Sequence, residues 1–206
     1  MSINSLLNNK SIILASGSEI RKKILVEAGL KFVVIPAQID EKELKKNLPK
    51  KNFERYCLEL AKAKALNVSN KKKESYVIGS DQICCFEDEI FSKPLTKENC
   101  FKTLSKLSGN THYQNCGISI CKEGKEVWSH YAKATLSMKT LSDKEIMNYI
   151  DEDEPFMACG AYRFESLGKN LFLSTEGDET TIQGLTLSPI LKFLSSEKII
   201  DSQKFY

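Results

Sequence analysis

The 206-residue sequence predicts an α/β protein, because segments with strand character alternate with segments of helical periodicity. The chain begins with such a unit: Ser11–Ala15 reads as a strand, Glu19–Ala28 repeats apolar residues at a helical spacing, and Lys31–Pro36 reads as a second strand. Further on, Thr111–Cys121 and Glu126–Met138 are long strand-like segments joined by a glycine-containing turn.

The remaining expected elements continue this alternation. In chain order they are a helix over Asn52–Asn67, strands over Tyr76–Gly79 and Ile83–Phe86, a helix from Thr96 to Leu107, a helix from Ser142 to Tyr149 or Ile150, and a last helix over Leu187–Leu194. Ser142 opens the capping-box pattern S-D-K-E. Asp151–Glu154 is expected as an acidic turn, followed by irregular, glycine-rich chain. No repeat or linker divides the sequence, so we expect a single domain over residues 1–206, in which two lobes around a cleft remain an open arrangement.

The composition argues against several classes of protein. The 30 basic and 27 acidic residues give a net charge of only +3, which argues against a nucleic-acid partner. No apolar run approaches the ~20 residues of a transmembrane helix. The start of the chain shows no signal peptide, so we expect no membrane partner and a cytoplasmic location. The seven cysteines lack C-x-x-C spacing and the two histidines are isolated, which favours reduced, packed thiols over a zinc site.

The loop Ser16–Arg21 lies between the first strand and the first helix and is the first candidate site. Backbone N–H groups and the positive end of a helix make such loops anion sites. The hydroxyls of Ser16 and Ser18 add donors, and Arg21 can bind a phosphate through two hydrogen bonds. An ordinary serine N-cap with a surface arginine explains the same residues, and the spacing alone does not decide between the two readings.

A second candidate is the segment Gly79–Gln82, which we expect at the carboxyl end of a strand, where α/β folds bind ligands. Asp81 in this segment is suited to hold a divalent ion or to deprotonate a water molecule. An Asx turn between two short strands is the alternative.

Other charged residues fit the same chemistry. Asp40 and Glu41 follow a strand and a proline, and paired acids beside a phosphate site suit Mg²⁺. A solvated loop with a helix N-cap is the alternative. Lys64 and Lys93 are available to neutralise phosphate charge, although with 30 basic residues any single lysine is weak evidence.

The segment Gly160–Gly168 mixes glycine with aromatic and charged residues in an irregular part of the chain. Such segments often form pockets for nucleobases. Packing of the aromatic residues into the core is the alternative.

Taken in order, these segments resemble the Maf family of nucleotide pyrophosphatases. The matching stretches extend from about Ser11 to Leu194 and are Leu14-Ala15-Ser16-Gly17-Ser18-x-x-Arg21, Ile39-Asp40-Glu41, Leu60-Ala61-x-x-Lys64-Ala65, Ile78-Gly79-Ser80-Asp81-Gln82, Ser92-Lys93-Pro94, Leu107-Ser108-Gly109 and Gly184-Leu185. Each motif is short, but seven motifs in one order are specific together. The resemblance implies a two-lobed mixed sheet with flanking helices around a central cleft, similar to inosine triphosphate pyrophosphatases. It also implies a homodimer and a divalent metal cation, Mg²⁺ or Mn²⁺.

The resemblance also implies roles by position. Asp81 matches the proton acceptor and, with Glu41, would hold the metal. Residues at positions that handle the phosphates of a nucleoside triphosphate are Ser16, Ser18, Arg21, Lys64 and Lys93. Residues at positions that select the base are Ile20, Gln82 and Glu165. Attack of water on the α-phosphorus expels pyrophosphate, so cations and oriented donors must stabilise the negative charge.

The form of two motifs is similar to the branch of the family that hydrolyses 7-methyl-GTP. These motifs contain Gln82 after the aspartate and Glu165, whose carboxylate can accept from N1 and N2 of 7-methylguanine and suits its positive charge. Ile20 stands where that branch commonly has tryptophan, which keeps dTTP, UTP or a broader substrate range open. Glu19 replaces the usual proline, and its charge keeps open a nucleotide-binding regulator of cell division with little catalysis.

Overall fold

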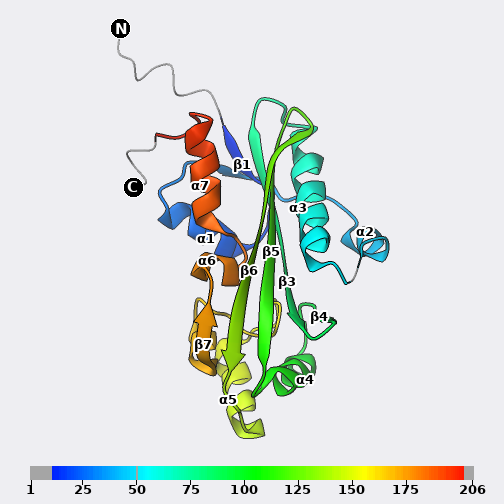
Figure 1. Ribbon diagram of the computed structural model, residues 1–206, viewed down its shortest axis with the longest axis vertical. Helices are drawn as coiled ribbons and strands as arrows, with labels where there is room; N and C mark the ends of the chain where they lie inside the picture. Colours follow the sequence, from blue (N-terminus) through cyan, green and yellow to red (C-terminus); the bar gives the residue numbers. More distant parts are fainter. Residues whose placement is uncertain (1–10, 50, 202–206) are drawn as a thin grey trace.

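A computed structural model describes residues 11–49 and 51–201 (Figure 1). The strands in this part of the chain are β1 (Ile12–Leu14), β2 (Val33–Val34), β3 (Tyr76–Phe86), β4 (Glu89–Phe91), β5 (Thr111–Lys122), β6 (Lys125–Met138) and β7 (Phe172–Glu176). The helices are α1 (Glu19–Glu27), α2 (Glu41–Lys46), α3 (Phe53–Ser69), α4 (Lys97–Leu107), α5 (Asp143–Asp153), α6 (Glu179–Ile182) and α7 (Leu187–Ser196), with a 3₁₀ helix at Leu167–Leu171. None of these helices is both long enough and apolar enough to cross a membrane.

The strands form one mixed sheet in the order β2-β1-β3-β5-β6-β7, and β4 pairs with β3 outside this path. β1 pairs in parallel with β2 and β3, whereas the other pairs are antiparallel. Helices α1 and α7 lie on one side of the sheet and α2 and α3 on the other (Figure 1). The expected α/β class, with a mixed sheet and flanking helices, is therefore confirmed.

The centre of the sheet differs from the sequence expectation. The two short strands expected at Tyr76–Gly79 and Ile83–Phe86 are one strand, β3, which continues through Ser80–Gln82. The expectation of a strand end or an Asx turn at Asp81 is therefore wrong. The reason is the neighbouring strand: β5 pairs with every residue of β3 from Val77 to Cys85 and keeps the polar segment extended.

Smaller differences occur at other elements. The strand expected at Lys31–Pro36 is reduced to the two residues of β2, and β7 and α6 were not expected. The helix N-cap given as the alternative at Asp40-Glu41 is present, because Asp40 caps α2 and accepts from the Glu43 N–H. The capping box at Ser142 is present, with Glu145 as its second member. The expected turn at Asp151–Glu154 instead continues α5, which Glu154 ends with a φ of 45°.

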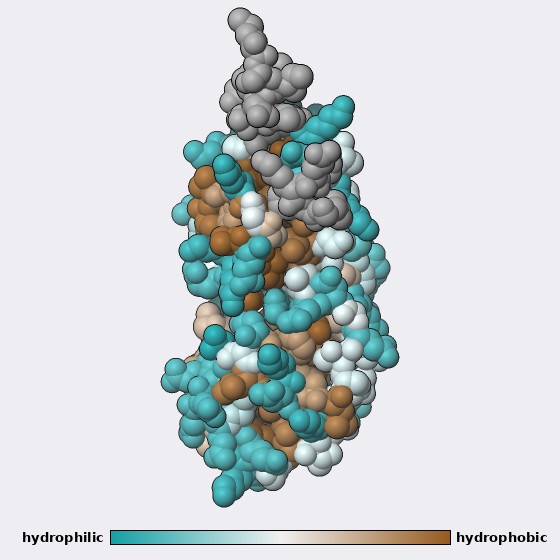
Figure 2. All heavy atoms as spheres, turned by 90° about the vertical axis from the view of Figure 1, so that its left-hand side faces the viewer, coloured by the Kyte–Doolittle hydropathy of each residue, from teal (hydrophilic) through white to brown (hydrophobic). Residues whose placement is uncertain are grey.

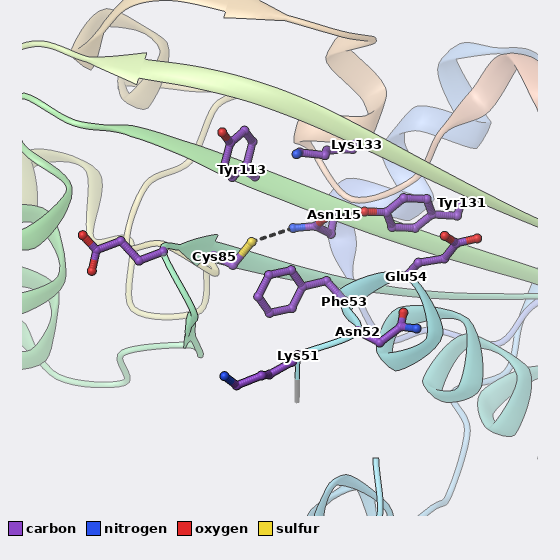
Figure 3. Close-up of a pocket in the computed structure, with 10 residues that line it drawn as sticks. Lys51, Asn52, Phe53, Glu54, Cys85, Tyr113, Asn115, Tyr131 and Lys133 are labelled. Atoms are coloured by element: carbon purple, nitrogen blue, oxygen red, sulfur yellow. Dashed lines mark hydrogen bonds between the residues drawn. The ribbon is translucent and has the colours of Figure 1, made fainter. Parts of the chain in front are cut away.

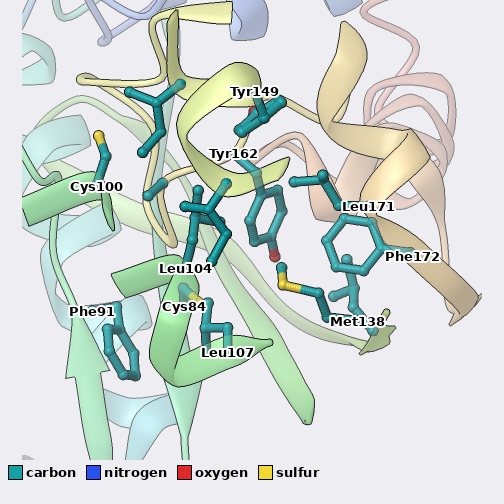
Figure 4. Close-up of a cluster of buried hydrophobic side chains, with 14 of the residues drawn as sticks. Cys84, Phe91, Cys100, Leu104, Leu107, Met138, Tyr149, Tyr162, Leu171 and Phe172 are labelled. Carbon is teal, nitrogen blue, oxygen red and sulfur yellow. The ribbon is translucent and has the colours of Figure 1, made fainter. Parts of the chain in front are cut away.

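Buried apolar side chains form a large cluster toward each end of the long strands β5 and β6. The upper cluster in Figure 1 joins β1, β3 and β5 to α1 and α7, and includes Leu14, Leu25, Ile78, Ile118 and Leu194. The lower cluster, drawn in Figure 4, joins β3 and β6 to α4 and α5, and includes Cys84, Leu104, Met138, Ile150 and Tyr162. Residues 79–83 of β3 lie between Ile78 and Cys84, and hence between the two clusters.

The surface on the α1 and α7 side is mixed in polarity. Figure 2 shows apolar side chains in both the upper and the lower part of this face, with hydrophilic side chains among them. Leu173 is the most exposed large apolar side chain of the described residues, at 72%. Singly exposed apolar residues of this kind are normal for a folded protein and need no separate explanation.

Gly79 allows α3 to lie directly against β3. A Cβ atom at this position would stand 2.2 Å from the carbonyl oxygen of Ala61 and 2.8 Å from the backbone nitrogen of Ala65. No larger residue fits without a shift of the helix. This close approach brings Lys64, the neighbour of Ala65, next to the strand that carries Asp81.

We therefore expect Gly79→Ala to reduce the free energy of unfolding by about 1–3 kcal/mol, the usual cost of overpacking. Gly17→Ala is the matched control, because the nearest atom to its Cβ would be Pro36 Cγ at an ordinary 3.9 Å. Urea unfolding of both variants measures the difference. Equal stability of the two variants would show that α3 does not depend on this contact.

Candidate functional site

β3 has two different partners along one edge. β1 pairs with Tyr76–Ile78 and β4 pairs with Cys84–Phe86, while β5 occupies the opposite edge. Between them, Gly79–Ile83 has no strand partner on the β1 side within the part of the chain that the structure describes. We call this gap the edge notch. Ligands of α/β proteins commonly bind where the connections of a sheet diverge in this way.

The loop after β1 forms one border of the edge notch, since the Ala15 N–H still bonds the Ile78 carbonyl of β3. Ser18 begins α1 without a side-chain capping bond, and its backbone N–H donates to Ser16 Oγ over 3.2 Å. Arg21 Nη1 donates to the same oxygen over 3.3 Å. The loop and the first turn of α1 therefore form one unit, whose N-terminal amides and Arg21 suit an anion.

Asp81 is directed toward α3, where Lys64 meets it. Lys64 Nζ donates to Asp81 Oδ1 over 2.6 Å and lies 3.0 Å from Glu41 Oε1 at the start of α2. The side chains of Lys64 and Asp81 are only 11% and 9% exposed. Lys45 Nζ lies 3.1 Å from the other oxygen of Glu41. Positive and negative groups thus alternate in the order Asp81, Lys64, Glu41, Lys45, which we call the charge chain.

The charge chain keeps Glu41 and Lys45 ionised. Burial acts to raise the pKa of the Glu41 carboxyl, but the ammonium groups of Lys64 and Lys45 outweigh burial, and the pKa is lowered. Burial likewise acts to lower the pKa of Lys45, but its hydrogen bond to Glu41 and the charge of Asp81 raise it. Glu41 and Lys45 are therefore charged at neutral pH.

Gln82 lies on the opposite face of β3, toward α6. Its Nε2 donates to the carbonyl oxygens of Thr181 and Ile182 over 3.0 and 2.6 Å. Both partners are acceptors, so the amide nitrogen of Gln82 must face them and its oxygen must face the other way. Gln82 therefore offers an acceptor, not a donor, to a ligand in the edge notch.

The carbonyl oxygen of Gly184 connects this face to the loop. It accepts from Arg21 Nε over 2.7 Å and from Ser80 Oγ over 2.9 Å. Gly184 has a φ of +101°, and a Cβ atom there would stand 3.0 Å from Gln82 Oε1 and 3.5 Å from Arg21 Nε. Arg21 and Gln82 thus approach each other across a residue that needs to be glycine.

Lys93 follows β4 and lies toward the other border of the edge notch. Its charge reaches the thiol of Cys159, which donates to the Gln82 carbonyl oxygen over 3.6 Å. Burial raises the pKa of the Cys159 thiol and Asp81 raises it further, whereas Lys93 and Arg21 act in the opposite direction. Groups from the borders and the floor of the edge notch therefore surround one thiol.

Two residues expected to select the base make none of these contacts in the described structure. Ile20 is half-buried and packs against the upper apolar cluster. Glu165 is 21% exposed, and its Oε1 lies 3.6 Å from Arg163 Nε. Glu19 is 86% exposed and pairs with Lys22, so its carboxylate lies in solvent.

The carboxylates near Lys64 fit a hard divalent cation. Within residues 11–49 and 51–201, no cluster of three or more His, Cys, Asp or Glu side chains forms a metal site. Glu41 and Asp81 nevertheless converge on one cation, the Lys64 ammonium, at 3.0 and 2.6 Å. Two carboxylates completed by phosphate oxygens are a typical donor set for Mg²⁺ or Mn²⁺. The pair therefore fits a metal that binds together with a phosphorylated substrate.

Sequence reasoning missed Lys45 and Cys159. Lys45 stands four residues after Glu41, a spacing that predicts an ion pair once α2 is known to be a helix. Cys159 lies in the irregular stretch before α6, where no periodic pattern indicates which way a side chain points.

A separate hollow of about 360 Å³ lies on the α3 side of the sheet, between the start of α3 and strands β3, β5 and β6 (Figure 3). Its polar groups bond one another: the Tyr131 hydroxyl donates to Asn115 Oδ1, and Asn115 Nδ2 donates to Cys85 Sγ over 2.9 Å. Lys133 Nζ lies 3.7 Å from the ring centre of Tyr113. None of the site residues expected from the sequence lines this hollow, so it is distinct from the edge notch.

Removal of Lys64 would leave Asp81 buried without its cation. We expect Lys64→Met to lower the free energy of unfolding by about 3 kcal/mol, as is typical for breaking a buried ion pair. Adding Asp81→Asn should recover part of this loss, because an amide needs no counter-charge. Lys62→Met, at a 41% exposed position of the same helix, is the control and should cost less than about 1 kcal/mol. Denaturant unfolding of the two single variants and the double variant gives the coupling energy between Lys64 and Asp81. A coupling energy of zero would refute the ion pair.

Comparisons with known proteins identify the relatives of this chain. The family model described as "Maf-like protein" matches residues 11–197. A nucleoside triphosphate pyrophosphatase of Legionella pneumophila (strain Lens) is 39% identical over 198 residues, covering 96% of this chain and 99% of the relative. One from Pelagibacter ubique (strain HTCC1062) is 37% identical over 189 residues, covering 90% and 97%. The solved structure of the Staphylococcus aureus Ham1 protein covers 91% of this chain and 100% of its own, at 18% identity and a TM-score of 0.45. Since the family match extends over nearly the whole chain and these sequence relatives align along most of its length, the chain belongs to the Maf-like protein family.

Proposed function

We propose that this protein hydrolyses a nucleoside triphosphate to the monophosphate and pyrophosphate. The observation that carries the proposal is the Lys64 ammonium held between Asp81 and Glu41 at the floor of the edge notch. The names of the sequence relatives, nucleoside triphosphate pyrophosphatases, support the same reaction. Arg21 and Lys93 add positive charge from the two borders, as a polyphosphate substrate requires.

In the proposed reaction, Asp81 accepts a proton from the attacking water. The water oxygen forms a bond to the α-phosphorus, and the bond from that phosphorus to the bridging oxygen breaks, so that pyrophosphate leaves. Arg21, Lys64 and Lys93 stabilise the charge on the phosphate oxygens, and the hydroxyls of Ser16 and Ser18 orient them. A divalent cation, Mg²⁺ or Mn²⁺, held by Glu41 and Asp81, would polarise the phosphoryl oxygens.

For the base we propose 7-methylguanine. The amide of Gln82 is fixed so that its oxygen is the free end, and Glu165 offers a second acceptor. Guanine carries donors at N1 and N2, which match acceptors. Thymine and uracil have only one ring donor between two carbonyl acceptors, and match them less well. Glu165 must approach the edge notch for this contact, since its carboxylate pairs with Arg163 in the structure described here.

The alternative substrates are dTTP, UTP or a broader set, favoured by Ile20, whose aliphatic side chain lacks the stacking surface of tryptophan. The other alternative, a nucleotide-binding regulator with little catalysis, was based on repulsion between the Glu19 carboxylate and the phosphates of the nucleotide. That carboxylate is 86% exposed and pairs with Lys22, so the reason for a catalytic defect is weakened.

We also propose that the enzyme acts as a homodimer in the cytoplasm. The described cysteines are free, and six of the seven are buried, in keeping with a reducing compartment. The dimer rests on the resemblance to the family, and sedimentation velocity tests it directly.

The reaction is tested with a panel of 7-methyl-GTP, GTP, dTTP and UTP in the presence of Mg²⁺ or Mn²⁺, with pyrophosphate release as the readout. We expect the highest kcat/KM for 7-methyl-GTP. Asp81→Asn should retain its circular dichroism spectrum but lose activity by at least ~100-fold, because general-base catalysis contributes about this much. Faster hydrolysis of the pyrimidine nucleotides would overturn the base assignment, and an active Asp81→Asn variant would remove Asp81 from its role.

The role of Glu165 is tested by Glu165→Gln. An amide keeps the size of the side chain but loses the charge-assisted hydrogen bond to the base. We expect kcat/KM for 7-methyl-GTP to fall by about ten-fold or more, with a smaller effect on UTP. Glu176→Gln, at an exposed position of β7, is the matched control. Parallel losses for both nucleotides would mean that Glu165 does not select the base.

A further inference from the structure

The charge chain ends at a residue that neither the sequence motifs nor the proposed reaction uses, Lys45. We propose that Lys45 is a further substrate-binding residue, which binds the terminal phosphates that leave as pyrophosphate. The inference rests on the proposed function and extends it, because it names the end of the substrate that α2 contacts.

Lys45 has the position that such a contact needs. Its ammonium lies 3.1 Å from Glu41 Oε2, while Lys64 Nζ lies 3.0 Å from Glu41 Oε1. One carboxylate therefore holds two ammonium groups, one on each oxygen. Lys64 also has Asp81 as a partner, whereas Lys45 has Glu41 alone among the ion pairs of the described residues. Lys45 would give up only one ion pair, so an incoming anion can bind it at a lower energetic cost than it can bind Lys64.

The neighbouring lysine on α2 shows what an ordinary surface lysine looks like. Lys46 pairs with Glu43 over 2.6 Å, and its side chain is 69% exposed. The Lys45 side chain is only 38% exposed and is directed to the centre of the charge chain. The Asp81 carboxylate on β3 also raises the pKa of Lys45, in keeping with an ammonium directed toward the charge chain.

Lys45 also shares its electrostatic environment with the other cations of the edge notch. The Cys159 thiol is influenced by Lys93, Arg21 and Lys45 together. These three groups come from the loop after β4, from α1 and from α2, which are distant in sequence. Lys45 therefore adds to the positive potential that Arg21, Lys64 and Lys93 supply to a polyanion at this site.

The face of β3 decides which end of the substrate Lys45 contacts. Asp81 and the charge chain lie on the α3 face, whereas Gln82 lies on the α6 face. The proposed general base and its metal-binding partner are therefore on one face, and the base-selecting amide is on the other, with Arg21 beside it. Lys45 lies beyond Glu41 on the face opposite Gln82, so it is placed for the terminal phosphates and not for the base.

The test compares Lys45→Met, which keeps the length of the side chain and removes its charge, with Lys46→Met as the matched control. The nucleotide is the best substrate of the panel, and inorganic pyrophosphate is the probe for direct binding by calorimetry. For Lys45→Met we expect KM to rise and pyrophosphate affinity to fall, each by about ten-fold or more, with kcat changed by less than about three-fold. Lys46→Met should match the wild type, and Lys45→Arg should restore most of the affinity.

A Lys45→Met protein with wild-type KM and wild-type pyrophosphate affinity would overturn the inference. An equal loss of pyrophosphate affinity in Lys45→Met and Lys46→Met would also overturn the inference, because such a loss would reflect only the net charge of α2. If the wild type hydrolyses no nucleotide, the proposed function fails, and the pyrophosphate measurement still decides whether Lys45 binds phosphate. If Lys45→Met does not fold, Lys45→Arg is compared with the wild type instead. The arginine keeps the positive charge, so a loss of pyrophosphate affinity in Lys45→Arg would contradict the proposed role.

Discussion

The Lys64 ammonium is the group on which the rest of the site depends. A carboxylate as buried as Asp81 is costly unless a cation and hydrogen bonds compensate its lost hydration. α3 supplies that cation only because Gly79 allows the helix backbone to touch the strand. The same ammonium holds Glu41 and with it the start of α2. One positive charge therefore sets the relative positions of a strand and two helices.

The unbroken course of β3 determines how the site divides its tasks. Successive side chains of a strand point to opposite faces, so Asp81 and Gln82 must lie on different sides of the sheet. The edge notch makes both faces reachable from one edge, because neither β1 nor β4 covers this stretch. If these residues formed a turn, the side chains of Asp81 and Gln82 would not have to point to opposite faces. The ladder with β5 instead fixes Asp81 and its cation on one face of the sheet and the Gln82 amide on the other.

Much of the fold was predictable where local signals are strong. Helices begin as expected where a side chain caps them, at Asn52, Thr96 and Ser142, and the long β5–β6 hairpin follows from its pattern and turn. The prediction failed where pairing with a distant strand determines the secondary structure. Examples are the continuation of β3 along β5, and β7, whose partner β6 lies far earlier in the chain.

The site was predictable to the extent that its residues lie in ordered motifs. The structure brings Asp81, Lys64 and Glu41 together as the motif order implied, and Gly184 links Arg21 to Ser80, the residue before Asp81. Lys45 was missed because the direction of its side chain depends on α2, a helix of which the sequence indicated only the N-cap as an alternative. Glu165 was assigned by motif alone, and its direction depends on an irregular loop for which no periodicity exists.

The carbonyl of Gly184 has a consequence for the order in which the molecule is made. Its partner Arg21 is 163 positions earlier, and Ser80 is 104 positions earlier. On the ribosome, the loop and β3 emerge long before the segment that orients Arg21 and fixes Gln82. A growing chain thus carries the charged half of the site without the half that positions the guanidinium and the amide. Contacts of such long sequence separation form late and slowly. The site is therefore complete only after the segment around Gly184 has been synthesised and has docked.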